Sequence, residues 1–525
     1  MHSCSIAQSA LPGASPLITD LLYCFARVSN FYPYDPGDGA AVAKAAAGLH
    51  YPPERRARLV ALLRAQNGDS PALARLARPD AVVIATGQQV GLFTGPAYSL
   101  YKALTAVRLA HGLSQQGLPA VAVFWLASED HDLAEINHCW VFDRQGLPVL
   151  IEAQGLEADR RPAGALSLPG GVVEQLREAL GGLPFAAEVL DLARQAYAPG
   201  IGFAAGFRAL LGRLLARHEL LFFDPLNPEA KQLLAPLLAH VAQHGEELAE
   251  LVLERSRELE AAGYHAQVRF ETYSSLLFLL EEGRRLALRR EGGDYVSGGR
   301  RFSARELADC AARLSPAAVL RPVVQDWLFP TAAVVMGPAE LAYWAQSQPL
   351  YGALGVSPPV GLPRASWTLV DRRAARLLDR YGLEPADFIS GEQALRERMA
   401  RRLAPPALQA ALGQCAAEIS GALEKLGREL HAFDASLERA FQTSRRKILY
   451  QVSKIERKAA REALRRDERA GRDAAWLFNQ LYPHRRLQER FYSILPFLAR
   501  HGLDLIERLY QAVPPDCRHH QVLVV

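Results

Sequence analysis

The sequence contains little cysteine and no long apolar run, and its charges are nearly balanced. Six cysteines are scattered through 525 residues without a CxxC or other ligand spacing, which argues against a disulfide scaffold and favours reduced thiols. No apolar stretch reaches the roughly 18 residues that a membrane span requires, and the first twenty residues do not resemble a signal peptide. A formal net charge of +4 gives no whole-chain signal for polyanion binding. We therefore expect a cytoplasmic protein without a membrane span.

The length of the chain predicts more than one structural unit, because a single hydrophobic core stops growing at roughly 250 to 300 residues. We divide the chain into five segments. A Rossmann-like core has its first part in 1–150 and its second part in 316–390, with an inserted connecting region, 151–315, between them. An α-helical coiled coil follows in 391–475, and a C-terminal helical segment, 476–525, docks on the core.

A β-α-β unit is predicted near the start of the core. The run AVVIAT (81–86) is typical of a strand buried on both faces, and it leads into the glycine-rich stretch GQQVGLFTGP. Pro96 is expected at the first helical position, and the helix should end at Gly112 and Gly117. The run AVAVFWLA (120–127) predicts a second buried strand. Strands joined in this way are parallel, so we expect an α/β, doubly wound sheet.

Three further segments are assigned by pattern. The stretch TAAVVMGPAELAYWAQ (331–346) repeats the order of strand, Gly-Pro and helix. Its neighbours, 321–330 and 358–371, are rich in proline, and we expect them to wrap the site rather than to form core strands. The inserted region is predicted to be helical to about residue 263, and its apolar runs broken by EEG, GG and SGG then indicate a small antiparallel meander.

A long helix is predicted from about 407 to 470, where glycine is rare. Apolar residues step by four and three from Ile419 to Ala440, and the pattern resumes at Ile448 after a stutter. At a rise of ~1.5 Å per residue the helix would reach roughly 90 Å. It must therefore pack on its own return segment or on a second subunit. The segment 481–511 is amphipathic, and we expect it to dock on the core.

The glycine-rich stretch offers backbone N–H groups beside a helix N-terminus, where an anion is stabilised. Lys102 lies about two turns into this helix, on the same face as Gly95 and Tyr98, and could reach a phosphate or a carboxylate. The spacing matches neither GxxxxGK[ST] nor GxGxxG. A tight turn between strand and helix, with no ligand, is therefore an equally good interpretation.

The segment SEDHD follows the second predicted strand and crowds like charges into one loop. Such charges disfavour folding unless a cation, an ammonium group or water satisfies them, so the segment is interpreted as a site for a substrate amine or magnesium. His131 is a candidate general base. His131, Glu135 and His138 would share one helix face and could hold zinc, but helix capping explains the spacing without a metal, and we predict no metal site.

Residues 442–470 contain ten Lys or Arg and four Asp or Glu. A basic stripe of this kind can bind nucleic acid. We favour a solvated coiled-coil face, because the aromatic residues that usually accompany nucleic-acid binding are almost missing there. Nucleic acid is therefore not an expected partner.

Four separated motifs, in order along the chain, resemble those of the BshC family, the cysteine-adding enzymes of bacillithiol synthesis. They are GQQVGLFTGPAYSLYK, FWLASEDHDLAEINH, RPVVQDWLFPTAAVVMGPAELAYW and HRRLQER. The resemblance implies a Rossmann-like core with inserted connecting segments and a coiled-coil domain that forms a homodimer. It also implies an enzyme that joins cysteine to the amine of glucosaminyl-malate.

This reaction assigns expected roles to the candidate residues. ATP is the expected activating nucleotide, with magnesium as a possible companion, because an amide forms only from an activated carboxylate. Lys102 and the backbone around Gly87 would hold anionic groups, Asp130 would bind an amine, and His131 would take its proton. The remaining expected substrate-binding residues are Gln88, Gln89, Thr94, Gly95, Tyr98, Glu129, Asp132, Gln325, Asp326, Glu340 and Arg364.

Ligases that resemble class I aminoacyl-tRNA synthetases usually carry an ATP-binding signature, which this sequence lacks. The sequence has no HIGH or KMSKS motif, so the nucleotide and the activated intermediate stay open. The alternative is a coiled-coil scaffold or a nucleotide- or thiol-sensing protein whose Rossmann-like core is not catalytic.

Overall fold

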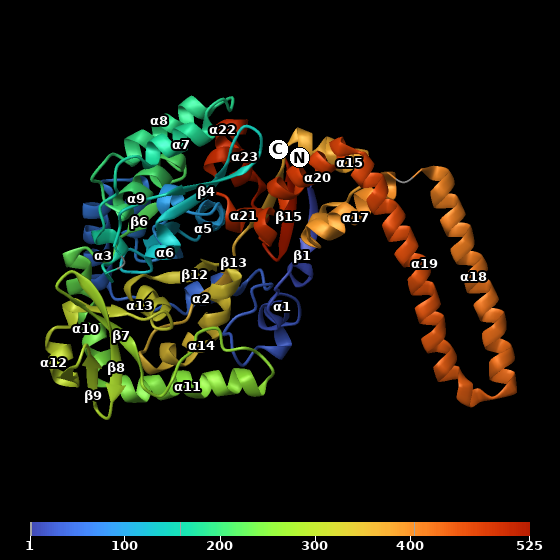
Figure 1. Ribbon diagram of the computed structural model, residues 1–525. Coiled ribbons are helices and arrows are strands. Elements are labelled where there is room, and N and C mark those ends of the chain that lie inside the picture. The colour runs from blue at the N-terminus through green and yellow to red at the C-terminus, as the bar shows by residue number, and fades with distance from the viewer. Residues whose placement is uncertain (1–2, 158, 404) are drawn as a thin grey trace. The chain divides into compact units, whose positions relative to one another are not determined.

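The computed structural model describes residues 3–157, 159–403 and 405–525 (Figure 1). They form two compact units. The larger unit contains Ser5–Trp367 and Glu489–Gln521, and the smaller contains Thr368–Gln488 with short pieces from both ends of the chain. The division therefore falls at Thr368, whereas the sequence-based division ended the core at 390.

A five-stranded parallel sheet forms the centre of the larger unit. Its strands are β2 (Val82–Gln88), β3 (Ala120–Leu126), β6 (Leu221–Phe223), β12 (Thr331–Met336) and β13 (Val360–Pro363). Their spatial order is β13-β12-β2-β3-β6, and every neighbouring pair is parallel. The order reverses between β2 and β12, as in a doubly wound Rossmann sheet. This confirms the predicted core.

Helices pack on the sheet. The helix α5 (Tyr98–Gln115) contacts β2, β3 and β12, whereas α3 (Pro53–Asn67) contacts β6 and α4 (Pro71–Leu76) contacts β3. Successive side chains of a strand point to opposite faces of the sheet. Val83 and Ala85 therefore lie on the same face, and both belong to the hydrophobic cluster that contains Leu63 and Leu73. The helix α5 continues through Gly112, contrary to expectation, because an isolated glycine costs a helix only ~1 kcal/mol.

Two core strands correct the sequence-based assignment. The strand β6 lies within the region predicted to be an insert, and β13 lies in the stretch predicted to wrap the site. The three buried residues of β6 are too few for a periodic signal. The strand β13 is an edge strand, where prolines are tolerated. Its Gly361 packs under Trp344, and a Cβ there would lie 2.4 Å from the indole ring.

The inserted region is helical and then antiparallel, as predicted. A hairpin of β4 (His138–Phe142) and β5 (Pro148–Glu152) precedes the helices. The later strands form a sheet in the order β10-β9-β8-β7-β11, antiparallel throughout. The helices are α7 (Val172–Leu180), α8 (Ala186–Ala196), α9 (Phe203–Leu214), α10 (Pro228–Gln243) and α11 (Gly245–Ala261); the strands are β7 (Ser274–Glu281), β8 (Arg284–Glu291), β9 (Asp294–Ser297), β10 (Arg300–Ser303) and β11 (Leu314–Pro316).

Other elements complete the larger unit. The helix α14 (Pro338–Ala353) follows β12 with Pro338 at its first position, as predicted, and α13 (Arg321–Leu328) precedes β12. In the C-terminal segment, α22 (Leu495–His501) contacts α8 and β4, and α23 (Leu505–Ala512) contacts α5. The remaining helices are α1 (Pro16–Tyr23), α2 (Ala41–Ala47), α6 (Leu133–Ile136), α12 (Ala304–Asp309) and α21 (Gln488–Phe491).

A further sheet has the order β1-β15-β14. Its strands are β1 (Ser3–Ala7), β14 (Ser366–Val370) and β15 (His519–Val524). The division of the chain into two units falls within these strands. Among the described residues, no helix combines the length and apolar character needed to cross a bilayer.

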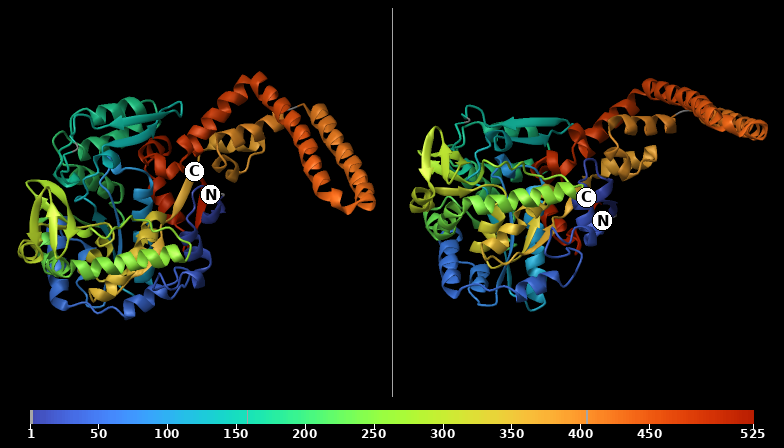
Figure 2. Two further views of the ribbon diagram at one scale, coloured as in Figure 1. Left: turned by 60° about the horizontal axis from the view of Figure 1, so that its bottom comes forward. Right: turned by 90° about the horizontal axis from the view of Figure 1, so that it is seen from below.

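The smaller unit carries a helical hairpin instead of the single long helix predicted over 407–470. The helices α18 (Pro406–Phe433) and α19 (Glu438–Arg466) run side by side in opposite directions (Figure 1, Figure 2). The chain turns at Asp434, whose backbone is extended and whose carboxylate accepts a hydrogen bond from the Ser436 N–H. The return segment is therefore the partner. The other helices are α15 (Arg372–Tyr381), α16 (Pro385–Ile389), α17 (Glu392–Leu403) and α20 (Glu468–Leu481).

The close approach of β2 and β3 gives a testable prediction. A Cβ on Gly87 would lie 2.7 Å from the backbone oxygen of Trp125, whereas a Cβ on Gly112 meets no atom within 4 Å. We expect Gly87→Ala to lower the free energy of unfolding by about 1–3 kcal/mol. The control Gly112→Ala should raise it by up to about 1 kcal/mol, because alanine favours a helix. Urea unfolding measures both changes, and a Gly87→Ala protein as stable as the wild type would contradict the packing.

Candidate functional site

The carboxyl ends of β2 and β12 lie where the strand order reverses, which is the position at which doubly wound sheets bind ligands. Gly87 and Gln88 end β2, and Gly337 follows β12 at the start of α14. A Cβ on Gly337 would come within 4.0 Å of Lys102, Glu340 and Arg364. Three charged residues that the sequence singled out therefore converge on one backbone position.

Lys102 is buried at this edge. Its ammonium group donates hydrogen bonds to the Gly87 carbonyl at 2.9 Å and to Gln88 Oε1 at 2.8 Å, and it forms an ion pair with Glu340. Only 2 % of the side chain is exposed. Burial lowers the pKa of Lys102, and the charge of Glu340 opposes that shift. The three oxygen partners already enclose the ammonium, so Lys102 positions Gln88 and Glu340.

Glu340 is surrounded by positive charge. It accepts a hydrogen bond from the Gly337 N–H at 2.8 Å at the start of α14. Burial would raise the pKa of Glu340, but Lys102 and then Arg321 reverse the shift and leave the pKa below its usual value. Arg321, which sequence reasoning missed although it opens the RPVVQDW motif, donates to Gln325 Oε1 at 3.1 Å and to the Tyr343 hydroxyl at 3.2 Å. Arg321 thus adds a positive charge to the edge beside the Lys102–Glu340 pair.

Arg364 is held from behind by Glu489, a second residue that the sequence did not single out. The guanidinium forms a two-pronged ion pair with the Glu489 carboxylate, at 2.9 and 2.6 Å, and it lies 5.3 Å from the Tyr98 ring centre. The Ser366 hydroxyl and the Trp367 N–H also donate to Glu489. Glu489 belongs to the quoted HRRLQER motif, which was the available signal. The two parallel hydrogen bonds hold the guanidinium group of Arg364 in one orientation.

A second cluster follows β3. Gln89 donates to Asp130 Oδ2 at 2.7 Å and also bonds to Glu135, and the His131 N–H donates to Asp130 Oδ1 at 2.8 Å. The neighbouring residue, Gln88, belongs to the Lys102 cluster. Two adjacent glutamines at the end of one strand therefore connect the glycine-rich stretch with the acidic segment, as expected from their places at one sheet edge.

The other carboxylates of the acidic segment have structural partners. Glu129 is buried in an ion pair with Lys231, whose ammonium also donates to the Leu314 carbonyl at 3.1 Å. The amine that Glu129 holds in this structure is thus that of Lys231. Asp132 caps α6 by accepting from the Ala134 N–H. Asp130 is left as the carboxylate of this segment that faces His131.

Gln325 and Asp326 lie in the core beneath α14. Asp326 accepts hydrogen bonds from Gln325 at 3.0 Å and from the Tyr351 hydroxyl at 2.6 Å. Burial raises the pKa of Asp326 to about 6. Gln325 is connected to the charged edge by the hydrogen bond that it accepts from Arg321. Their predicted substrate contacts stay a prediction, and the structure gives both residues internal hydrogen bonds.

The glycine-rich stretch is strained and mostly buried. Phe93 and Thr94 have φ of 50° and 68°, and Gly95 has φ of 63°, a region that costs energy for residues other than glycine. The N–H groups of Gly91, Thr94 and Gly95 donate within the protein, to the Gln89 carbonyl, the Tyr197 hydroxyl and the Leu92 carbonyl. These donors therefore shape the turn and do not face an anion.

No group of three His, Cys, Asp or Glu in the described part of the chain is arranged to hold a metal. The zinc alternative fails because α6 is a single turn, Leu133–Ile136, and His138 lies on β4. His138 instead pairs with the Asn137 side chain at 3.2 Å. Magnesium stays a prediction, because Mg²⁺ is usually held by substrate phosphates and water with only one or two protein carboxylates.

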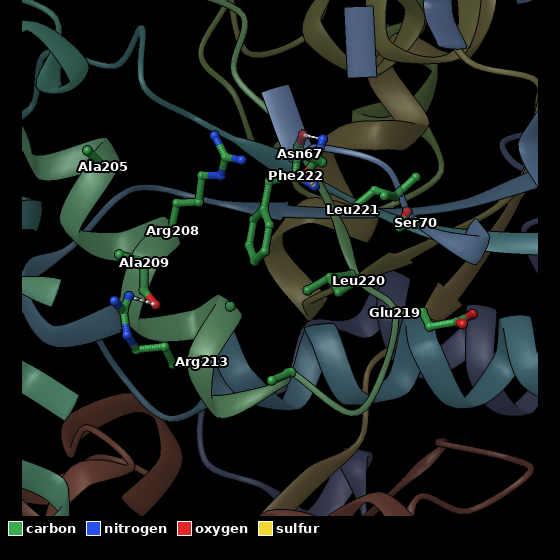
Figure 3. A pocket seen from close by; sticks show the side chains of 12 residues that line it. Asn67, Ser70, Ala205, Arg208, Ala209, Arg213, Glu219, Leu220, Leu221 and Phe222 are labelled. Atoms are coloured by element: carbon green, nitrogen blue, oxygen red, sulfur yellow. Dashed lines mark hydrogen bonds between the residues drawn. The ribbon is translucent and has the colours of Figure 1, made fainter. Parts of the chain in front are cut away.

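A cavity of about 560 Å³ lies elsewhere, between α9 and the edge strand β6 (Figure 3). Phe222, Ala209 and Arg208 are among the residues that line it. The residues predicted from the sequence do not line this cavity. The amide of Asn67 pairs with both backbone groups of Phe222, at 2.8 Å each, and so protects the sheet edge.

Comparisons with known proteins match the whole chain. Residues 1–365 match the family model described as bacillithiol biosynthesis BshC, N-terminal Rossmann-like domain, and residues 367–525 match the BshC C-terminal coiled-coil domain. A relative from Solibacter usitatus is 49 % identical over 100 % of both chains. Relatives from Koribacter versatilis (35 %, 99 % of both chains) and Salinibacter ruber (32 %, 99 % and 98 %) are also similar. All three carry the name "Putative cysteine ligase BshC".

The group behind Arg364 predicts a pH dependence of stability. His520 Nδ1 lies 2.7 Å from the Ser366 hydroxyl, and burial lowers the pKa of His520 to about 4. Below pH ~6.5 the unfolded chain takes up a proton that native His520 refuses, so stability should fall by about 2 kcal/mol between pH 6.5 and 5. His520→Gln should flatten this slope in urea unfolding series. An equally steep profile in the variant would contradict the assignment.

Proposed function

The chain belongs to the BshC family, and from this premise we propose that it is a cysteine ligase of bacillithiol biosynthesis. In the proposed reaction the carboxylate of cysteine is activated by ATP, and the amine of glucosaminyl-malate attacks the activated carboxyl group. The carbon–nitrogen bond of the amide forms and the bond to the phosphate or adenylate leaving group breaks. The amine gives up its proton to the protein or to the leaving group.

The observation that carries this proposal is the connection of two clusters of opposite character by Gln88 and Gln89. Gln88 bonds to Lys102 beside Glu340, Arg321 and Arg364, and Gln89 bonds to Asp130. Positive charge suits the carboxylates and phosphates of the reactants, and a carboxylate suits an amine. Amide formation needs both kinds of site within reach of one reacting centre. Arg364 and Arg321 are the proposed contacts of anionic groups, and Asp130 is the proposed contact of the amine.

Asp130 tests the proposal. We expect Asp130→Asn to lower the formation of bacillithiol from ATP, cysteine and glucosaminyl-malate by at least about 10²-fold, because the amine loses its carboxylate partner. Mass spectrometry of the product measures the change. The control is Asp309→Asn, an exposed aspartate at the end of α12, which should leave product formation unchanged. Undiminished product with Asp130→Asn, or unchanged thiol levels in cells, would favour the non-catalytic scaffold.

We also propose that the hairpin of α18 and α19 joins two copies of the chain. Large apolar side chains are exposed along it, including Leu426 (49 %), Ile448 (42 %), Tyr450 (54 %) and Ile455 (59 %). An apolar surface of this kind is typical of a helix interface that a second chain covers. The family's C-terminal domain is described as a coiled coil, which supports the same arrangement.

A charge on this surface should separate the copies. We expect Ile455→Glu to lower the dimer fraction in sedimentation velocity at micromolar concentration, because a buried unpaired carboxylate costs several kcal/mol. Thr443→Glu places the same charge at an exposed polar position of α19 and should leave the dimer intact. A wild-type protein that sediments as a monomer would contradict the proposal directly.

A further inference from the structure

His131 is surrounded by groups that fix the state of its ring. Nδ1 lies 3.5 Å from Arg285 Nη1 and 4.0 Å from Asp130 Oδ1. The ring edge packs against Phe278, with ring centres 5.8 Å apart. The side chain is partly exposed, at 30 %. The remaining ring nitrogen, Nε2, has no hydrogen-bond partner among the described residues.

Arg285 is held rigidly on β8. Its guanidinium donates to Ser315 Oγ at 3.1 Å and to the Pro316 carbonyl at 2.8 Å, and it lies 4.0 Å from the centre of the Phe278 ring. These contacts leave Nη1 directed at His131 and Asp130, with Asp130 Oδ1 at 3.7 Å. A guanidinium only donates hydrogen bonds and stays protonated in proteins. Nδ1 of His131 must therefore accept, and in a neutral ring the proton then lies on Nε2.

Burial and the Arg285 guanidinium favour the neutral form of the His131 ring. Burial lowers the pKa of His131, and Arg285 and Arg160 lower it further, while Asp130 and Asp132 act in the opposite direction. The balance leaves the pKa below that of an ordinary histidine. The Arg285 guanidinium that faces Nδ1 at 3.5 Å also disfavours a proton on that nitrogen, so contact geometry and burial both favour the neutral ring.

We infer that His131 is a neutral hydrogen-bond donor, through Nε2–H, to the carbonyl oxygen of an activated carboxyl group, and that Arg285 is the positioning residue that fixes this tautomer. This role rests on the proposed ligase function. It differs from the role of general base predicted from the sequence, because the only basic nitrogen of the ring faces Arg285. A donor aimed at a carbonyl oxygen stabilises the negative charge that develops there as the amine attacks.

The same geometry assigns the proton acceptor. When the amine nitrogen bonds to the carboxyl carbon, its proton passes to the Asp130 carboxylate, and the phosphate or adenylate group leaves with the electron pair of the broken bond. Asp130 keeps free lone pairs for this proton. Each of its oxygens accepts one hydrogen bond, Oδ2 from the Gln89 side chain and Oδ1 from the backbone N–H of His131. A neutral imidazole that donates to the oxyanion and a carboxylate that takes the proton divide the work between two adjacent residues.

The tautomer can be measured directly in the full-length protein. Uniform ¹⁵N labelling of histidine and long-range ¹H–¹⁵N correlation spectra distinguish the two neutral tautomers and the protonated ring, and His131→Gln assigns the signal. We expect the Nε2–H tautomer at pH 7. An Nδ1–H tautomer or a protonated ring in the wild type would overturn the inference without any variant.

Two variants test whether Arg285 fixes the tautomer of His131. Arg285→Met should mix the tautomers and move the midpoint of the His131 titration toward higher pH, because a donor and a positive charge are removed. Arg289→Met, on the same strand and exposed, should change neither. An unchanged His131 signal in a folded Arg285→Met protein would contradict the role of Arg285. The spectra do not depend on product formation, so they hold whether or not the protein joins cysteine to glucosaminyl-malate.

Activity separates a donor from a base. The amide of glutamine can donate a hydrogen bond but cannot take a proton, so His131→Gln should form product at least tenfold faster than His131→Ala. Equal loss in the two variants would support the base role and overturn the donor role. Absence of product in the wild type as well would count against the proposed function, while the ring measurement would still decide the tautomer.

Discussion

A buried ammonium group must be enclosed by oxygen atoms, and Lys102 imposes this constraint on the edge where the strand order reverses. Its three oxygen partners come from the end of β2, from the side chain of Gln88 and from α14. The ion pair with Glu340 joins two helices that follow different strands of the sheet. Removing either charge would leave the other buried and unpaired, at a cost of about 3–5 kcal/mol. The position of Gln88, and through the backbone that of Gln89, depends on this enclosure.

The chemistry of this edge depends on the charged groups that lie outside the Lys102–Glu340 pair. Lys102 pairs with Glu340 and Arg364 pairs with Glu489, whereas Arg321 donates to two uncharged groups, Gln325 Oε1 and the Tyr343 hydroxyl. Gln89 also contacts the acidic segment. In that segment Glu129 forms an ion pair with Lys231, and Asp130 lies beside His131. A cationic half and an acidic half thus meet at the end of one strand. This arrangement supports the proposed joining of a carboxylate to an amine.

Much of the core could be predicted from the sequence, because its signals are local. Buried strands were recognised as short apolar runs, and a Gly-Pro turn marks where α14 begins, although α5 begins at Tyr98, two residues after Pro96. The strand β6 was missed because its three apolar residues are too few to show a periodic pattern. The turn at Asp434 was missed because the break is short and the apolar spacing continues in the helices on both sides of it. The glycine-rich stretch is a strained, buried turn, in which Gly87 allows the close approach of the Trp125 backbone; ligand binding by this stretch stays a prediction.

The site residues divide in the same way. Residues within the motifs, such as Lys102 and Asp130, could be found because unusual types cluster in short stretches. Their partners could not: Glu489 meets Arg364 across 125 positions, and Arg285 meets His131 across 154. Which arginine in the run RRLALRR turns inward is decided by the register of β8 against β7, a tertiary property.

The central claim is that this edge activates the carboxylate of cysteine before an amine attacks it. Cysteine labelled with ¹⁸O in its carboxylate tests this directly, when it is incubated with ATP and glucosaminyl-malate and the nucleotide products are analysed by mass spectrometry. The account predicts that one ¹⁸O atom appears in phosphate or in AMP for each amide bond formed. Product that forms while all of the label stays in the amide or in unreacted cysteine would contradict it.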